Sequence, residues 1–403
     1  AICISKAKSS ISLGGRSSRR TMIVGVEAAC SLVHPTKVGT WHVHAPRIIR
    51  PAPDSGLSNF FHGSPSGLRN LPNTLLVGAM SCLCVAARHN IRGGPNSSAR
   101  RRCLRNSAVA DPKVAGIAVP ARKLVAKGRV SAALPVPPDI VRPPYVAEPE
   151  AVRGWWNMRI QPRSAEDAVA MRAAGKLAHA TLDLAGELIK PGLTSEELEA
   201  ELHQFICDGG AYPSDLHYKG FPKSVMISIN EVICHGIPDD RPLENGDLVN
   251  VDVTLYLNGF HADTARTWVC GETDNVGRRL VSATKEALDA AVAVCRPGAP
   301  MKAIGDAVCN IAEREGFGVV KGLVGHGIGE FFHGVPQVFH TRTNDKRKMV
   351  EGTAFTIEPV LTEGSPDWIT WEDGWTNATR DGGRAVQFEH TVLITADGCE
   401  VFT

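Results

Sequence analysis

The sequence predicts an α/β (α+β) domain made of two similar halves, preceded by a basic N-terminal region of different composition. A pattern of helix, Pro-Gly, helix and Gly occurs twice in the 403 residues, with the second Pro-Gly 106 positions after the first. Strand-like segments follow each copy, which favours a duplicated α+β unit with a site where the halves meet. Coincidence is the alternative explanation, because Gly and Pro commonly separate helices.

The charge of the chain divides it into two regions. Residues 1–110 contain 15 Lys and Arg, 15 Ser and only two acids, whereas residues 111–403 contain 29 basic and 40 acidic residues, so the net charge of +2 conceals a body at −11. An Arg- and Ser-rich, acid-poor leader is typical of an organellar transit peptide, and its lack of hydrophobic periodicity predicts disorder. A basic tail that binds nucleic acid or an anionic membrane is the alternative. The whole composition excludes collagen-like, coiled-coil and fully disordered chains.

Residues 111–150 are predicted to be a Pro-rich linker, and residues 151–403 the folded domain. The stretch 134–148 (LPVPPDIVRPPYVAE) is typical of an extended linker. The longest uncharged apolar run, 75–87, has 13 residues, whereas a membrane-spanning helix needs about 20, so we predict no membrane insertion. The six cysteines of the domain show no metal-type spacing, and we expect reduced thiols.

The first half begins with two helices. Ser164 with Asp167, and Thr194 with Glu197, form capping patterns at their starts. Pro191-Gly192 ends the first helix and Gly209-Gly210 ends the second. The residues expected to be buried are Val169, Ala173, Leu177, Leu184 and Leu188 in the first helix, and Leu198, Leu202, Phe205 and Ile206 in the second.

The second half repeats this arrangement. A helix around residues 276–294 ends at Pro297-Gly298, and a second helix ends at Gly316. The residues expected to be buried are Leu280, Ala287, Leu288, Ala291 and Val294, then Ile304, Val308, Ile311 and Ala312. The expected strands are Val225–Ile229 and Leu248–Leu257 after the first helix pair, and Ala354–Leu361 and Val386–Thr395 after the second.

A predicted β-hairpin in the first half carries two acids. Asn258-Gly259 follows a β-branched strand and is the strongest two-residue hairpin signal. With this turn, Thr254 faces Asp263 and Asp252 faces Ala265, so the two carboxylates are diagonal neighbours on one face, with Cα atoms about 7–8 Å apart. Asp is disfavoured in strands, and two on one face repel each other unless a cation lies between them. We therefore favour a metal site over the alternative of a solvated outer face.

Three further segments carry residues of metal-ligand type. His326 lies among glycines in Gly325–Gly329, Glu358 precedes a Pro in an apolar segment, and Glu389 lies in another apolar segment. Each alone would be explained as a structural His or an edge-exposed Glu. Together with the hairpin, four carboxylates balance two divalent cations, and oxygen-rich ligands with one imidazole suit Co, Mn, Fe or Zn. Two such ions about 3.5–4 Å apart activate water and polarise a carbonyl, which is hydrolytic chemistry.

These motifs together resemble the type 1 methionine aminopeptidases. The resemblance covers about residues 163–403, and its motifs are colinear with those of the family: NEVICHGIP at 230–238, the hairpin with Asp252 and Asp263, Gly-His326-Gly-Ile-Gly, Ile-Glu358-Pro and Phe-Glu389-His-Thr. It implies the pita-bread fold, with pseudo-twofold halves and a central antiparallel sheet flanked by helices. That fold agrees with the repeat.

The resemblance also implies a ligand set for two divalent metal ions. Asp252 would chelate one metal, and Asp263 and Glu389 would bridge both. His326 and Glu358 would complete one metal's shell. Glu358 is also the family's candidate general base.

The family's remaining site residues contact the substrate. His235 and His333 would stay off the metals, hydrogen-bond the scissile amide and stabilise the tetrahedral intermediate. The methionine pocket would consist of Tyr218, Phe221, Met226, Phe332 and Trp375. Phe221 and Met226 depart from the Tyr and Cys that bacterial members often carry, which weakens the assignment of the pocket relative to that of the metal ligands.

Two features indicate the subtype. Glu358 and Glu389 are 31 positions apart, which leaves no room for the large insertion of type 2 enzymes, and the leader lacks the paired zinc-finger cysteines of the cytosolic eukaryotic type 1 form. The combination resembles the plant organellar enzymes, so the chloroplast is the expected location, with the mitochondrion or both as the alternative. The expected partners are nascent or newly imported polypeptides with an N-terminal Met, with no direct binding of nucleic acid and a monomeric enzyme.

Two other hypotheses keep the fold and change the function. A prolidase or aminopeptidase P would cleave X-Pro peptides, but such proteins usually carry a large extra N-terminal domain, and residues 1–150 are too basic and aperiodic to form one. A metal-free binding module would have lost metal ligands, and none is missing from this sequence. Its acidic body also disfavours nucleic-acid binding.

Overall fold

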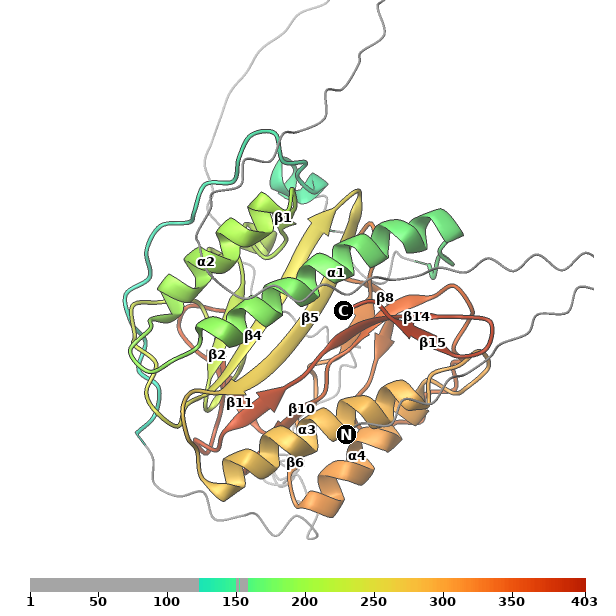
Figure 1. The fold of residues 1–403 in the computed structure, drawn as a ribbon. Coiled ribbons are helices and arrows are strands. Elements are labelled where there is room, and N and C mark those ends of the chain that lie inside the picture. The colour runs from blue at the N-terminus through green and yellow to red at the C-terminus, as the bar shows by residue number, and fades with distance from the viewer. Residues whose placement is uncertain (1–122, 150–151, 153–158) are drawn as a thin grey trace, which may run out of the picture. The chain divides into compact units, whose positions relative to one another are not determined.

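The computed structural model of the protein describes residues 123–149, 152 and 159–403, which form two helix pairs and four antiparallel sheets (Figure 1). The α-helices are α1 (Ala165–Leu188), α2 (Ser195–Asp208), α3 (Asn275–Ala293) and α4 (Lys302–Glu315), and single 3-10 turns are η1 (Pro144–Val146) and η4 (Tyr218–Gly220). The strands are β1 (Tyr212–Pro213), β2 (Met226–Ile229), β3 (Val232–Cys234), β4 (Leu248–Leu257), β5 (Phe260–Val269), β6 (Gly318–Val319), β7 (Gly325–Gly327), β8 (Gly334–Val338), β9 (Ala354–Ile357), β10 (Val360–Thr362), β11 (Trp368–Thr370), β12 (Asn377–Thr379), β13 (Ala385–Gln387), β14 (His390–Ile394) and β15 (Cys399–Val401).

In the first half, α1 and α2 pack on the sheet in which β4 pairs with β1, β2 and β5 (Figure 1). Both predicted capping boxes are present, at Ser164 and at Thr194. Leu198, Leu202 and Ile206 of α2 are fully buried, as predicted, while Phe205 is half-buried. The helix pair thus anchors the hairpin that carries the two acids.

The predicted buried face of α1 is wrong at Val169 and Ala173, whereas the other three predicted residues pack against the core. Val169 is 64% exposed and Ala173 is exposed, whereas Ala174 and Ala178 are fully buried. The reason is close packing, because a Cβ at Gly175 would lie 2.3 Å from the Phe402 carbonyl oxygen. Small side chains therefore face the sheet, and the larger Leu177, Leu184 and Leu188 are only half-buried beside it.

The predicted hairpin is confirmed in both turn and register. Asn258 and Gly259 form its two-residue turn, with φ of 54° and 88°. Thr254 lies opposite Asp263, and Asp252 lies opposite Ala265. The two acids therefore share one face of the sheet.

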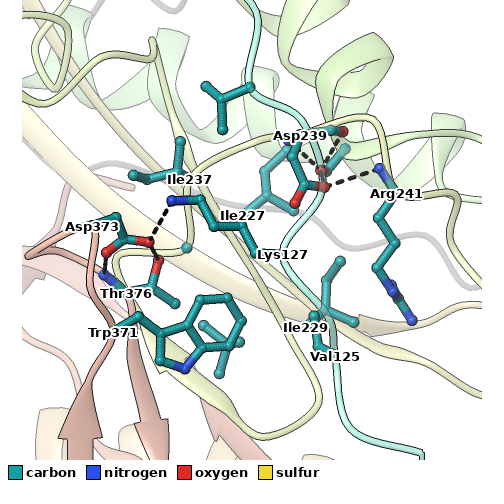
Figure 2. Close-up of a pocket in the computed structure, with 14 residues that line it drawn as sticks. Val125, Lys127, Ile227, Ile229, Ile237, Asp239, Arg241, Trp371, Asp373 and Thr376 are labelled. Carbon is teal, nitrogen blue, oxygen red and sulfur yellow. Dashed lines mark hydrogen bonds and ion pairs between the residues drawn. The ribbon is translucent and has the colours of Figure 1, made fainter.

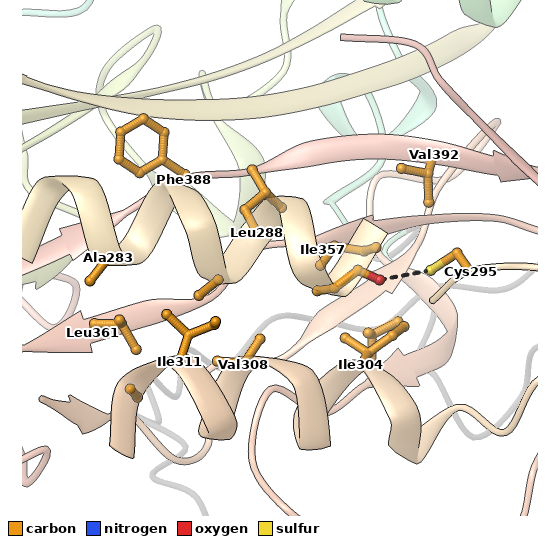
Figure 3. Packing of buried hydrophobic residues seen from close by; sticks show 14 of the residues in the cluster. Ala283, Leu288, Cys295, Ile304, Val308, Ile311, Ile357, Leu361, Phe388 and Val392 are labelled. Carbon is orange, nitrogen blue, oxygen red and sulfur yellow. Dashed lines mark hydrogen bonds between the residues drawn. The ribbon is translucent and has the colours of Figure 1, made fainter. Parts of the chain in front are cut away.

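In the second half, α3 and α4 cover a separate core (Figure 3). Leu288 of α3 and Val308 of α4 pack in one cluster with Ile357 of β9 and Leu361 of β10. All the predicted core residues of these helices are buried except Val294, which is half-buried. Each half thus has its own helix pair and its own core, as the repeat predicted.

Two predicted strands are each divided by an acid. Ala354–Leu361 is broken between β9 and β10 at Glu358-Pro359, and Val386–Thr395 is broken between β13 and β14 at Phe388-Glu389. The backbone N–H of Glu358 donates to His340 Nε2 at 3.0 Å, and that of Glu389 donates to the Ala265 carbonyl at 2.8 Å. Proline also removes one ladder donor at 359. These breaks turn both carboxylates out of their sheets and into a cavity.

The described part of the predicted linker, residues 123–149, is mostly extended, contains the 3-10 turn η1 near its end, and lies along the folded domain. We call this segment the strap. The Gly128 N–H donates to Asp239 Oδ2 at 2.6 Å, and the Ser131 N–H donates to Glu196 Oε1 at 2.7 Å. Near its end, the Tyr145 hydroxyl donates to the Ser214 carbonyl. The predicted transit-like leader, 1–110, lies outside the described residues.

The described residues contain six cysteines and several helices, which bear on two further predictions. Cys207, Cys234, Cys270, Cys295, Cys309 and Cys399 are free thiols, as predicted. Within the described part of the chain, none of the helices combines the length and the apolar character that a membrane span requires.

Candidate metal centre

A cavity of about 250 Å³ lies where the two halves meet. Its wall contains all five residues predicted as metal ligands: Asp252, Asp263, His326, Glu358 and Glu389. Two come from the β4–β5 hairpin of the first half, and three come from β7 and from the strand breaks of the second half. The site therefore depends on both halves.

Hydrogen bonds between β5 and the second half fix the junction. The Thr264 hydroxyl donates to the Glu389 carbonyl at 2.9 Å, and the Thr391 hydroxyl donates to the Asp263 carbonyl at 2.7 Å. The Asp263 N–H in turn donates to the Thr391 hydroxyl oxygen at 3.1 Å. These bonds set the Asp263 and Glu389 backbones side by side.

Neighbouring hydroxyls orient two of the carboxylates. The Thr254 hydroxyl donates to Asp263 Oδ1 at 2.6 Å, and the Thr356 hydroxyl donates to Glu358 Oε1 at 2.8 Å. Thr356 also accepts the backbone N–H of His326 at 2.9 Å, which ties β7 to β9. The ligand side chains are thus held before any ion binds.

The ligand atoms converge. One ligand atom each from Asp263, His326 and Glu389 lie within 4.8 Å of one another, and all three residues are buried. His326 Nε2 is 3.4 Å from Asp263 Oδ2 and 3.7 Å from Glu358 Oε1. Asp252 completes the group from the adjacent position on the hairpin face.

The buried and acidic surroundings disfavour the charged forms of the carboxyl groups in the cavity. Burial, and then the Asp263 carboxylate, raise the pKa values of Asp252 and Glu389 well above their usual range. Burial, partly offset by His326, raises the pKa of Glu358 to about 7. Burial lowers the pKa of His326, but Asp263 and Glu358 more than compensate and raise it. Bound cations would relieve the repulsion among these clustered acids and favour their ionised forms.

The residues present fit divalent metal ions. Four carboxylates and one imidazole face one buried space, and Glu389 Oε1 has no hydrogen-bond partner among the described residues. An unpaired buried carboxylate oxygen is costly unless a ligand satisfies it. Oxygen-rich ligands with one histidine match divalent first-row transition metals.

Two further histidines lie beside the ligands. The His333 ring centroid is 4.2 Å from that of His326, and its Nδ1 is 3.0 Å from the Tyr218 hydroxyl. His235, held at φ 57°, has its Nδ1 3.2 Å from Asn377 Nδ2. Burial lowers the pKa of His235 to about 4 and that of His333 well below its usual value, so both are neutral at pH 7.

Most of the predicted methionine-pocket residues line the same cavity. Tyr218, Met226, Phe332 and Trp375 contribute to its wall. Phe221 does not, because it lies behind Trp375 in an edge-on contact with ring centroids 5.2 Å apart. The structure thus places one apolar and aromatic wall next to the cluster of ligands.

Sequence reasoning missed several polar residues of the site. Asp215 and Gln387 line the cavity, and Thr254 and Thr356 orient its ligands. Thr254 had a signal, since the predicted register put it opposite Asp263. Asp215 had none, because an Asp in a loop is usually solvated.

The comparisons with known proteins agree with this geometry. The model of metallopeptidase family M24 matches residues 169–396. The chain is 48% identical over 282 residues to methionine aminopeptidase 1D, chloroplastic/mitochondrial, of Arabidopsis thaliana, an alignment that covers 70% of this chain and 80% of the relative. It is 45% identical over 280 residues to the human mitochondrial methionine aminopeptidase 1D, with 70% and 83% covered.

Solved structures give the same result. A methionine aminopeptidase from Rickettsia prowazekii superposes with a TM-score of 0.60 at 43% identity, covering 61% of this chain and all of that one. A prolidase from Pyrococcus furiosus shares the fold less closely, with a TM-score of 0.50 at 25% identity over 60% of this chain and 65% of that one. The chain belongs to metallopeptidase family M24 and, within it, to the methionine aminopeptidases.

Proposed function

We propose that this protein removes the initiator methionine from nascent or newly imported polypeptides by hydrolysing the first peptide bond. The observation that carries the proposal is a single cavity in which buried carboxylates and a histidine converge beside an aromatic wall. The relatives named above are methionine aminopeptidases, and the chain covers most of their length.

The metal ligands in this proposal are Asp252, Asp263, His326, Glu358 and Glu389, which would hold two divalent ions. Four ionised carboxylates match the charge of two such ions. The ligand types suit Co, Mn, Fe or Zn. When bound, divalent ions supply Lewis-acid polarisation of a carbonyl and lower the pKa of water.

The protein's own groups handle the proton and the substrate. Glu358 lies in the cavity wall and is oriented by the Thr356 hydroxyl, so its carboxylate is suited to take a proton and return it to the leaving amine. His235 and His333 are neutral and held by Asn377 and Tyr218, so each can present a ring nitrogen to the scissile amide. Charge that develops on the amide oxygen would thereby be stabilised.

The aromatic wall selects the first side chain. Tyr218, Met226, Phe332 and Trp375 offer a lined space for one linear apolar side chain next to the ligands. Phe221 supports this wall from behind by holding Trp375. The wall would orient the N-terminal residue so that its carbonyl faces the metal centre.

A peptide assay tests the proposal against the X-Pro alternative. We expect the protein with Mn or Co to release free methionine from a Met-Ala-Ser peptide, and to leave an Ala-Pro-Ser peptide intact. Failure to cleave the Met peptide with any of Co, Mn, Fe or Zn would sink the proposal. Cleavage of the X-Pro peptide alone would assign the chain to the prolidase branch of the fold.

The location of the enzyme is proposed to be an organelle, with the chloroplast favoured over the mitochondrion. The support is the basic, acid-poor composition of residues 1–110 and the organellar names of the Arabidopsis and human relatives. A fluorescent fusion of residues 1–122 in plant cells should label chloroplasts. Label in the mitochondria or the cytosol would contradict that choice. We also expect a monomer, which sedimentation equilibrium would measure.

We further propose that the functional enzyme begins before the strap and not at residue 151. The backbone N–H groups of the strap donate hydrogen bonds to acid side chains at three points: Gly128 to Asp239, Arg129 to Asp240 and Ser131 to Glu196. Its contacts thus satisfy acids at the start of α2 and in the loop before β4.

The strap also touches the loop that carries part of the site. Figure 2 shows Lys127 of the strap beside Asp373, with Nζ 3.8 Å from Oδ2, over a small pocket lined by Val125, Ile227 and Trp371. Asp373 accepts the backbone N–H groups of Trp375 and Thr376 at 2.9 Å. The strap therefore packs against the turn that positions Trp375.

Truncation tests this boundary. We expect a chain that starts at Lys123 to be as stable and active as the full chain. A chain that starts at 150 should melt at a lower temperature and lose activity, because Tyr145 leaves a cavity and several acids lose their donors. Equal melting temperatures and equal kcat/KM for the two truncated chains would show that the strap is only a linker.

A further inference from the structure

One lysine in the wall of the cavity has no role in the metal centre or the methionine pocket described above. Lys219 is exposed, lines the cavity beside Tyr218 and His333, and is the one Lys or Arg of that wall among the described residues. The acids of the same wall are the four acidic ligands and the buried Asp215. Two divalent ions would balance the ligand carboxylates, so Lys219 would set the charge that a substrate meets at the edge of the cavity.

The turn that carries Lys219 is held at both ends. In η4, the His217 N–H donates to the Phe221 carbonyl at 2.9 Å, and the Phe221 N–H donates to the Tyr218 carbonyl at 3.0 Å. Lys219 itself has a φ of 49°, in the left-handed region that residues other than glycine seldom adopt. The lysine side chain therefore starts from a fixed point at the edge of the cavity.

The ammonium group of Lys219 lies close to the groups that would hold the scissile amide. Its Nζ is 5.3 Å from the centroid of the Tyr218 ring, and the Tyr218 hydroxyl is the partner of His333 Nδ1. Burial lowers the pKa values of His235 and His333, with a smaller contribution from the Lys219 charge. Among the described residues, no carboxylate forms an ion pair with Lys219. Its charge is thus free to interact with a substrate.

We propose that Lys219 recognises acidic side chains in the third and fourth residues of the substrate, so that the enzyme favours polypeptides in which Asp or Glu closely follows the initiator methionine. His235 and His333 would hold the amide between the first two residues, and an extended chain advances about 3.3–3.6 Å per residue. A long, flexible lysine beside both histidines therefore reaches the side chains that come soon after this amide. Its charge attracts carboxylates there and repels cations. This inference rests on the proposed aminopeptidase function.

An adjoining cavity carries the opposite charge. It has a volume of about 340 Å³, shares part of the aromatic wall with the metal cavity, and is also lined by the exposed Glu148 and Glu330. A substrate chain that left through this space would favour basic residues after the methionine. We favour Lys219 because it lines the cavity that contains the ligands, whereas these two acids do not, and because Glu330 already lies 3.9 Å from the Arg163 guanidinium.

The experiment compares three peptides of the form Met-Ala-X-X-Ser, in which both X residues are Glu, Gln or Lys. A C-terminal amide removes the terminal carboxylate, which would itself bind the lysine. The measured quantity is the ratio of kcat/KM for each charged peptide to kcat/KM for the Gln peptide. At low salt we expect a ratio of about 3 or more for Glu and about one-third or less for Lys. An increase in salt from about 0.01 M to about 1 M should bring both ratios towards one.

Matched variants assign the preference to Lys219. Lys219→Arg keeps the charge and should keep both ratios. Lys219→Gln should bring both ratios to about one, and Lys219→Glu should favour the Lys peptide. Lys176→Gln, at an exposed position of α1 outside the cavity wall, removes the same charge and should leave the ratios unchanged. Both lysines are exposed, so these substitutions should not prevent folding.

Equal kcat/KM values for the three peptides in the wild type would overturn the inference, and so would a preference for the Lys peptide. A preference for Glu that persists in Lys219→Gln would also overturn it, because that preference would arise from another group or from peptide acids that bind the metal ions. If the wild type cleaves neither the Gln peptide nor Met-Ala-Ser, the proposed function fails instead. The two failures are therefore distinguishable.

Discussion

Two threonine hydroxyls orient carboxylates in the candidate metal centre. Thr254 and Thr356 each donate to a ligand carboxylate, and neither is itself of metal-ligand type. Their positions follow from the sheets, since Thr254 lies opposite Asp263 and Thr356 is two residues before Glu358. A carboxylate oriented in this way loses less conformational freedom when an ion binds. Removal of the hydroxyl should therefore lower the affinity for the metal ion.

Thr254→Val tests this orientation. The substitution keeps the shape and removes the 2.6 Å hydrogen bond to Asp263, so metal affinity should fall about 10- to 100-fold. Competition with a chelator of known affinity measures the change. The control is Thr181→Val, a buried Thr of α1 whose hydroxyl binds the Leu177 carbonyl, and which should not alter affinity. Equal affinities in the two variants would contradict the role of Thr254.

The pKa of Glu358 predicts how the metal-free protein responds to pH. Its folded pKa, about 7, is raised above the unfolded value, so its contribution to stability is complete below the unfolded pKa and is lost as pH rises through about 7. The free energy of unfolding should therefore fall by about 1 kcal/mol between about pH 6 and about pH 8.

Denaturant titrations of the metal-free protein at the two pH values measure this loss. Glu358→Gln cannot titrate and should reduce the slope. Metal affinity should change in the opposite direction, because the ions need the ionised carboxylates and binding releases protons. A metal-free protein that becomes more stable towards pH 8 would refute the assignment of the raised pKa.

At the level of elements, the sequence predicted the long, strongly patterned segments and failed at the short ones. The β4–β5 hairpin was predicted to the residue, because Asn258-Gly259 allows one register only. The strands around Glu358 and Glu389 were predicted as continuous, because hydrophobic pattern alone does not report that a backbone N–H bonds His340 or Ala265 instead of a neighbouring strand.

The same limit applies to the candidate site. All five predicted ligands line one cavity, since each stands out as a charged or imidazole group in an apolar or Gly-rich segment. Phe221 was predicted to line the pocket and lies one layer behind it. Asp215 and the strap were not foreseen, because their contacts lie far apart in the sequence and depend on tertiary packing.

Gly259 provides a test of the hairpin that carries Asp252 and Asp263. Its φ is +88°, and a Cβ added there would meet no atom within 4 Å, so Gly259→Ala adds backbone strain without a clash. We expect a loss of about 1–2 kcal/mol in unfolding free energy. Gly398→Ala is the control, because that position is equally open but lacks the positive φ, and it should be neutral. Equal effects in both variants would contradict the strained turn.

At the scale of the whole molecule, the site joins the two halves. Asp252 and Asp263 belong to the first half, while His326, Glu358 and Glu389 belong to the second, and direct hydrogen bonds link β5 to the 387–391 segment. Bound ions would add a further link across this junction. Metal should therefore stabilise the domain as a unit rather than one half of it.

Chelation should reveal this coupling. With metal at 100 to 1,000 times its dissociation constant, about 3–4 kcal/mol of stability depends on binding, so removal should lower the melting temperature measurably. Hydrogen exchange should increase along β5 and residues 387–391, while α4, which contributes no residue to the cavity wall, should change least. Faster exchange confined to one half would show that the ions do not couple the halves.

One titration tests most directly whether this protein is a dinuclear metal-dependent aminopeptidase. Metal-free protein is titrated with Mn, and bound metal and methionine released from Met-Ala-Ser are measured on the same samples. We expect no release of methionine without metal. Release should rise with metal occupancy and should be abolished in Glu389→Gln. Release by metal-free protein, or full occupancy without release, would contradict this expectation.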